Sequence, residues 1–323
     1  MVRFLRHYGT LMGMAAIVLV FWALLPQTFM TARNWLNITQ QVSMLTVVAV
    51  AMTVVMVVGD FDLSVGSMAS LAGIVAAVLF TLGFSVPAAL AVALGVGLVG
   101  GLLNGVLVSV IGILPFVATL ATLTMYSGAA FILSGGKTIF GRDIPQAFGD
   151  FAKSGLSLGS LGDKPVVLPW LTLLALALTG VIFVVLELST YGRRLYAIGG
   201  NAEAARLAGV RVTWLRLTAY GFTGVGAAVA GLMYASRVAS ANPTQGEGLM
   251  LNAIAAVFLG MTLTRHGQPR VLASVLGVLV LGIMDNGLTQ LQVDSYVREV
   301  LVGLIILLAV SISALGRKAI GRR

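Results

Sequence analysis

The sequence predicts an all-α protein, a polytopic membrane helix bundle of about ten transmembrane helices. Three observations predict this fold class. Hydrophobic residues make up 59% of the 323 residues. Charged residues make up only 10%, against about 25% in soluble domains. Apolar runs recur along the whole chain, and no polar segment is long enough for a soluble domain. We therefore expect one transmembrane domain that covers residues 1–323.

Most of the apolar runs approach the length that a bilayer requires, about 20 residues for a membrane-spanning helix, whereas the second, third and eighth predicted spans are short. The first run follows Arg3 and Arg6 and has no small-residue cleavage site after it, so we expect a retained span rather than a signal peptide. The predicted spans cover roughly residues 9–25, 41–58, 66–82, 87–111, 115–133, 167–187, 215–236, 249–264, 270–289 and 297–315.

Basic residues predict the orientation of these spans. With an even span count both termini share one side, and that side collects 13 of the 20 Lys and Arg residues. Basic loops stay in the cytoplasm, so we expect a multi-pass protein of the bacterial inner membrane with both termini cytoplasmic. Two long loops carry most of the predicted water-facing surface: an external loop at about 134–166 and a cytoplasmic loop at about 188–214. We expect protein partners to dock there.

Several function classes are excluded by composition. The chain has no cysteine, which removes disulfides and thiolate metal sites. His7 and His266 are too few and too far apart for a metal centre. The net charge of +9 lies in loops between apolar runs, as in membrane proteins, so we expect no nucleic-acid partner. No cluster of His, Cys or carboxylates predicts a catalytic site, and we expect no cofactor.

A P-loop for nucleotide binding is also excluded. Residues Gly135–Thr138 read Gly-Gly-Lys-Thr, like the end of that motif. The motif needs a glycine at position 131, where this chain has Phe131, and the segment closes an apolar run. Any ATPase that works with this chain is therefore expected on another polypeptide.

The cytoplasmic loop contains a short helix with marked ends. The pair Gly199–Gly200 permits a sharp turn, and Asn201 is a good N-cap. Glu203 in the first turn and Arg206 toward the last match the helix dipole. Gly209 is a natural terminator. These residues predict a helix of about two turns on the cytosolic surface, and an ordinary connector helix would show the same features.

The same residues carry a resemblance to a known family. Glu203, Ala204 and Ala205, with Gly209 after three further residues, resemble the EAA-type coupling loop of ABC importer permeases. The wider stretch 196–210, YAIGGNAEAARLAGV, is similar to the ribose/arabinose/xylose branch. The resemblance implies that this helix inserts into a groove of a cytosolic ATP-binding subunit. It also implies a second permease copy, expected as a homodimer, and an external or periplasmic sugar-binding protein.

A second motif, after the short cytoplasmic helix, is the predicted turn at 59–66. It contains two carboxylates and reads GDFDLSVG. Carboxylates between apolar spans cost free energy unless they meet water, a helix end or a partner. Asp62 or Ser64 can cap a helix that begins near Gly66. Alternatively, Asp60, Asp62 and Ser64 mark a helix break that lines a transport path or meets the ATPase. The turn resembles the G-x-x-DLSVGS signature of the same sugar-permease family, and its Asp60 variant resembles the arabinose branch.

Polar residues inside other predicted spans are the remaining candidates for a translocation path. They usually face the bundle interior or a water-filled cavity. We favour interhelical hydrogen bonding for Asn104 and a pathway role for Asp285 beside Asn286, with Asn252 as a further path candidate. A separate pattern, a glycine every fourth residue, predicts one smooth face for close helix packing, at Gly97, Gly101 and Gly105.

These residues bear on three classes of function. The resemblance, which runs from about residue 40 to 315, favours the permease subunit of an ATP-driven, binding-protein-dependent importer for a monosaccharide, with a pentose such as arabinose, xylose or ribose preferred. The alternative is an ion-coupled secondary transporter of a small polar solute. That class needs a titratable relay in the core, where Asp285 is almost alone. A membrane enzyme needs clustered catalytic side chains, which the sequence does not offer.

Overall fold

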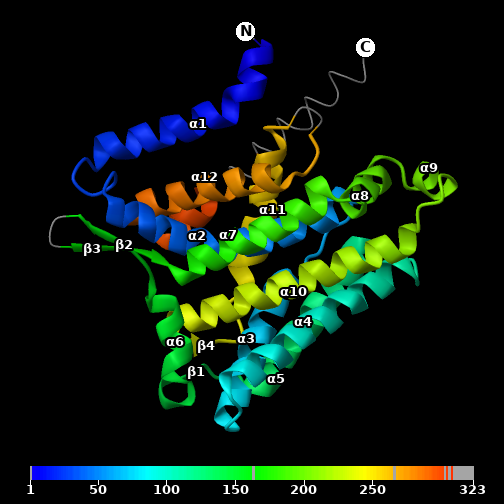
Figure 1. Ribbon diagram of the computed structural model, residues 1–323, viewed down its shortest axis with the longest axis horizontal. Helices are drawn as coiled ribbons and strands as arrows, with labels where there is room; N and C mark the ends of the chain where they lie inside the picture. The colour runs from blue at the N-terminus through cyan, green and yellow to red at the C-terminus, as the bar shows by residue number, and fades with distance from the viewer. Residues whose placement is uncertain (1, 162–163, 265–266, 302, 305–306, 308–323) are drawn as a thin grey trace.

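The long helices form where the apolar runs are longest. The computed structural model describes residues 2–161, 164–264, 267–301, 303–304 and 307, and the helices lie in a layered bundle (Figure 1). The helices that match predicted spans are α1 Val2–Leu24, α2 Ala32–Val57, α3 Val65–Thr81, α4 Val86–Ser109, α5 Pro115–Ser134, α7 Trp170–Phe183, α10 Val212–Val238, α11 Glu247–Met261 and α12 Val271–Gln290.

The predicted fold class is confirmed. Among the described residues, six helical segments are long and apolar enough to cross a membrane: α2, α4, α5, α10, α12, and α7 together with the π-helical turn η2 (Val184–Leu188). Three shorter apolar helices, Met12–Leu24, α3 and α11, match the first, third and eighth predicted spans. The tenth predicted span, 297–315, lies largely outside the described residues.

Local sequence explains several helix ends. Pro115 starts α5 and Pro87 lies in the first turn of α4, where a missing N–H removes no helical hydrogen bond. Gly135 ends α5 in the left-handed conformation, with φ of +60°, which glycine adopts without strain. The Thr31 side chain caps α2 by accepting a hydrogen bond from the Asn34 N–H.

Short elements fill the two long loops at opposite ends of the bundle. The predicted external loop holds β1 (Ile139–Phe140), η1 (Gly141–Asp143), α6 (Gln146–Lys153), β2 (Gly155–Leu161) and the start of β3 (Lys164–Pro169). Strands β2 and β3 form an antiparallel hairpin, and β1 pairs antiparallel with β4 (Ser240–Ala241). The predicted cytoplasmic loop holds α8 (Thr190–Gly200) and α9 (Ala202–Leu207). Figure 1 shows α6 and the hairpin at one end of the long helices and α8 and α9 at the other.

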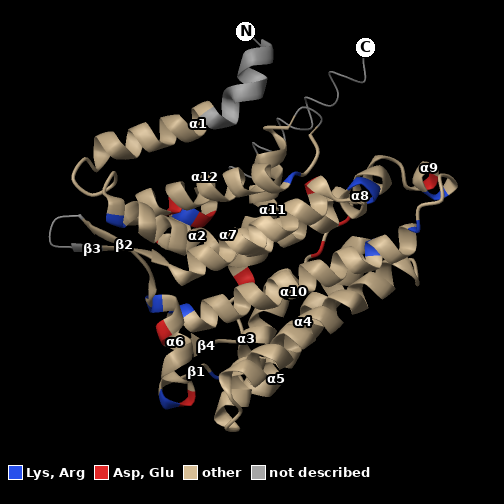
Figure 2. Ribbon diagram, in the orientation of Figure 1, with Lys and Arg blue, Asp and Glu red and all other residues tan. Residues whose placement is uncertain are grey.

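Helix α10 lies at the centre of the bundle, where it packs against α2, α3 and α4. Gly97, Gly101 and Gly105 of α4 form the contact with α10, because an added Cβ at each would collide with the α10 backbone. Such stripes of small residues let two helices approach closely. Charged residues lie mostly near the ends of the long helices (Figure 2), as a bilayer requires.

Candidate functional site

The candidate coupling site is the α8–α9 pair at the end of the bundle. The Asn201 side chain accepts a hydrogen bond of 2.9 Å from the Ala204 N–H, which caps α9. Gly209 follows the helix with φ of +82°, a conformation that suits glycine. Arg206 donates a 2.7 Å hydrogen bond to Glu203, and both side chains are exposed. The short helix therefore presents a charge pair to solvent.

Helix α9 is seated on the bundle through one face. Ala205 is 6% exposed and belongs to an apolar cluster with Leu195 of α8 and Leu215 of α10. The opposite face carries Ala204 and Leu207, and Leu207 is 82% exposed.

Helix α8 touches the end of α2 through backbone. Gly199 lies so close to the Val57 carbonyl group that an added Cβ would collide with it. An added Cβ at Gly200 meets nothing within 4 Å. The two glycines therefore do not form the turn that the sequence predicted: both lie in the last turn of α8, and Asn201 makes the turn with an extended φ of −161°. Gly199 is required for packing.

The α2–α3 turn is held by a buried ion pair. Arg216 of α10 donates two hydrogen bonds to Asp60, from Nε at 2.9 Å and from Nη2 at 2.6 Å. The Asp60 side chain is 4% exposed and that of Arg216 is 26% exposed. Tyr220, one helical turn further along α10, donates to the Phe61 carbonyl oxygen at 3.3 Å. The two-pronged contact fixes the turn to α10.

The second carboxylate of this turn lies in a buried polar cluster. Asp62 accepts hydrogen bonds from the Ser64 N–H at 2.9 Å and the Ser64 hydroxyl at 2.6 Å. Asn104 of α4 donates to the Ser64 hydroxyl at 2.8 Å and to the Asp62 carboxylate at 3.3 Å. Thr122 of α5 donates to the Asn104 carbonyl oxygen at 2.7 Å. The cluster joins α3, α4 and α5 around one buried carboxyl group.

This geometry corrects the capping interpretation of the turn. Helix α3 begins at Val65 with Ser64 at the N-cap position, but no side chain caps it. The physical reason is competition, because the Ser64 hydroxyl donates to Asp62 and accepts from Asn104. Asn104 makes interhelical hydrogen bonds, the arrangement that we favoured for it. A role for Asp60, Asp62 or Ser64 in a transport path stays a prediction.

Asp285 on α12 has charged and polar partners. Arg298 donates to its Oδ1 at 2.7 Å, and Gln41 of α2 donates to its Oδ2 at 2.6 Å. The neighbouring Asn286 is buried and accepts a 2.9 Å hydrogen bond from Gln290. The charge of Asp285 is thus compensated, which the sequence did not predict. A pathway role for Asp285 and Asn286 stays a prediction.

Helix α11 contributes two further polar groups. Asn252 is half-buried, and within the described part of the chain no hydrogen bond of its side chain is found. Glu247, which the sequence analysis did not single out, is exposed at the start of α11 together with Gly248 and Leu251. The sequence does carry a signal for Glu247, because a carboxylate at the start of an apolar run costs free energy unless it meets water or a partner.

A second charge cluster ties α8 to the start of α12. Tyr196 donates to Glu187 at 2.9 Å, and Arg270 donates to the other Glu187 oxygen at 2.7 Å. Burial, and then the nearby Glu187 carboxylate, raise the pKa of Tyr196. Among the described residues, no group of three or more His, Asp and Glu side chains could hold a metal ion.

The chain belongs to the family described as branched-chain amino acid transport system / permease component, whose model matches residues 34–310. It is thus a permease component by family.

Two sequence relatives agree with this assignment along almost the whole chain. The ribose import permease protein RbsC of Bacillus subtilis is 37% identical over 306 residues, which cover 95% of this chain and 92% of RbsC. The L-arabinose transport system permease protein AraH of Escherichia coli K12 is 34% identical over 318 residues, which cover 98% of this chain and 93% of AraH. A solved inward-facing ABC transporter of the metal-chelate type has a TM-score of 0.48 at 14% identity, and the match covers 98% of this chain and 99% of that one.

Proposed function

We propose that the chain is the membrane-spanning subunit of an ATP-driven importer for a monosaccharide, with a pentose preferred. The relatives named for ribose and L-arabinose support the substrate class. Two copies of the chain would enclose the path. A cytosolic ATP-binding subunit would drive transport, and an external or periplasmic sugar-binding protein would deliver the sugar.

The observation that carries this proposal is the exposed, capped helix α9 at the tip of the bundle. Its outer face presents Glu203, Arg206 and Leu207, while Ala205 seats it on an apolar cluster that includes Val57 at the end of α2. A six-residue helix is marginal in water by itself. A docked ATP-binding subunit would hold it, and the apolar seat would pass its displacement to α2 and α10.

The test replaces Glu203 by Lys and Ala205 by Gly in one double variant. The first change puts a positive charge at the helix N-terminus, and the second weakens the helix by up to about 1 kcal/mol. With the ATP-binding subunit and the sugar-binding protein in proteoliposomes, we expect ATP-driven uptake of labelled pentose to fall severalfold while insertion is unchanged. Arg33→Glu, a charge reversal at an exposed position in the first turn of α2, outside both long loops, is the matched control.

The outcome separates the two transport classes. If the double variant binds the ATP-binding subunit and imports sugar like the parent, α9 is only a connector and the coupling role is abandoned. If uptake needs no ATP and stops when ionophores collapse the ion gradients, the ion-coupled secondary transporter is the better description.

We also propose that both termini, α8 and α9 are cytoplasmic and that α6 and the β2–β3 hairpin are external, because the basic residues are distributed in that way. The native chain has no cysteine, so single introduced cysteines are clean probes. In intact cells, an impermeant thiol reagent should label a cysteine at Asp150 and leave one at Glu203 unlabelled. Labelling only of the cysteine at position 203 would reverse the orientation.

A further inference from the structure

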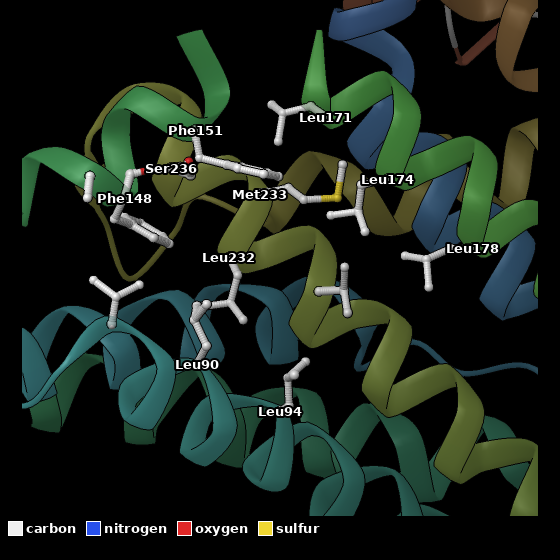
Figure 3. Close-up of a pocket in the computed structure, with 13 residues that line it drawn as sticks. Leu90, Leu94, Phe148, Phe151, Leu171, Leu174, Leu178, Leu232, Met233 and Ser236 are labelled. Atoms are coloured by element: carbon white, nitrogen blue, oxygen red, sulfur yellow. Dashed lines mark hydrogen bonds between the residues drawn. The ribbon is translucent and has the colours of Figure 1, made fainter. Parts of the chain in front are cut away.

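A half-open cavity lies between α4, α6, α7 and α10, away from the polar clusters. Its volume is about 380 Å³. Figure 3 shows Leu171, Leu174 and Leu178 of α7 on one side and Leu90 and Leu94 of α4 on the other, with α10 between them. Phe148 and Phe151 of α6 lie at one end, where the Ser236 hydroxyl donates to the Phe148 carbonyl oxygen.

The lining does not suit a sugar. Ser236 is the one polar side chain among the lining residues, and its hydroxyl donor is already used by Phe148. A sugar buried here would lose its hydrogen bonds to water without replacement, which is strongly unfavourable. The remaining lining residues are aliphatic, aromatic or Met side chains. The cavity is therefore suited to a hydrocarbon.

The bilayer reaches the walls of this cavity. Only 28% of the apolar window of α4 and 33% of that of α7 are buried, against 83% for α2. Val92 and Val99 of α4 and Leu176 and Val181 of α7 are exposed large apolar residues. The two walls are thus helices that face lipid, so an acyl chain has access from the membrane.

A cation lies just beyond one end of the cavity. Val229 and Met233 line it from one ridge of α10, and Arg237 comes next on that ridge, because residues four apart share a helix face. Arg237 is partly buried, and none of the ion pairs found in the described part of the chain includes it. Lys153, two residues beyond Phe151 at the end of α6, is exposed.

We propose that this cavity binds one acyl chain of a membrane glycerophospholipid, with the lipid phosphate held by Arg237 and Lys153. An apolar cavity beside an unpaired guanidinium has the two-part chemistry of such a lipid. A guanidinium matches a phosphate in charge and geometry. Amphipathic α6, with Phe148 buried and Phe151 partly exposed, would lie over the lipid at the membrane surface.

The test uses the full chain in nanodiscs that contain phosphatidylglycerol with a photoactivatable diazirine in its acyl chain. Cross-linked peptides are identified by mass spectrometry. We expect cross-links at the cavity residues Leu94 and Leu178, in addition to those at lipid-facing Val99 and Leu176. Arg237→Gln should lower the cavity cross-links about fivefold relative to the lipid-facing ones, as expected for one basic residue near anionic lipid.

Arg142→Gln is the matched control, because Arg142 is an exposed arginine of the external loop that does not line the cavity. It should leave the ratio of cavity to lipid-facing cross-links unchanged. Leu174→Trp, which fills the cavity, should remove the cavity cross-links. The proposal is wrong if the cavity positions of the parent stay unlabelled. It is also wrong if Arg237→Gln has the same ratio of cavity to lipid-facing cross-links as the parent.

Discussion

Replacing Arg216 by Gln is expected to destabilise the folded chain by about 3 kcal/mol. Asp60 would be left as a buried carboxylate without its guanidinium, and removal of one partner from a buried ion pair costs about 3–5 kcal/mol. We expect the lower end of this range, because the Arg216 side chain is 26% exposed and the pair is therefore only partly shielded from water. Thermal unfolding of the purified chain in detergent, followed by tryptophan fluorescence, would show a lowered midpoint.

Two variants make this result specific to the buried pair. Arg206→Gln breaks the exposed pair with Glu203, whose side chains are 62% and 66% exposed, and should hardly move the midpoint. The double variant Asp60→Asn with Arg216→Gln removes both charges and should regain much of the loss. An Arg216→Gln variant as stable as the parent would show that water, rather than Arg216, compensates Asp60.

Replacing Gly199 by Ala is expected to uncouple ATP hydrolysis from transport. The new methyl group would collide with the Val57 carbonyl group, so α8 would have to move away from the end of α2. Overpacking of this kind costs about 1–3 kcal/mol. The displaced helix would carry α9 with it and change its position against the ATP-binding subunit. Reconstituted uptake should fall severalfold, and ATP hydrolysis should lose its stimulation by the sugar-binding protein.

The adjacent glycine supplies the control for this prediction. Gly200→Ala changes the same residue type in the same helical turn, and its added Cβ meets nothing within 4 Å. It should transport like the parent. Equal activity of the two alanine variants would mean that the contact between α8 and α2 does not transmit the movement.

Much of the fold could be predicted from the sequence because a bilayer imposes a length on every span. The first, third and eighth spans were placed on runs that become the shorter helices Met12–Leu24, α3 and α11. Local signals were equally informative for α9, where Asn201 and Gly209 occupy the ends of the helix. These predictions depend on residues that are close together in the chain.

The partners of the charged residues could not be predicted, because they come from distant parts of the chain. Asp60 and Arg216 are 156 positions apart, and Gln41 and Asp285 are 244 apart. A single sequence gives the cost of an unpaired carboxylate but not the residue that relieves it. Gly199 illustrates the same limit, since a glycine pair predicts a turn and only the packed structure shows a close contact with α2.

The pairing of Asp60 with Arg216 also has a consequence for the order in which the protein assembles during synthesis. At roughly 5–20 residues per second, the 156 positions that separate the two residues take about 8–31 s to synthesise. During that interval the Asp60 carboxylate has no guanidinium, and α2 and α3 cannot bury their connecting turn without penalty. We therefore expect the turn to stay at the water-exposed membrane surface, and α2 and α3 to reach their final depth only after α10 has left the ribosome.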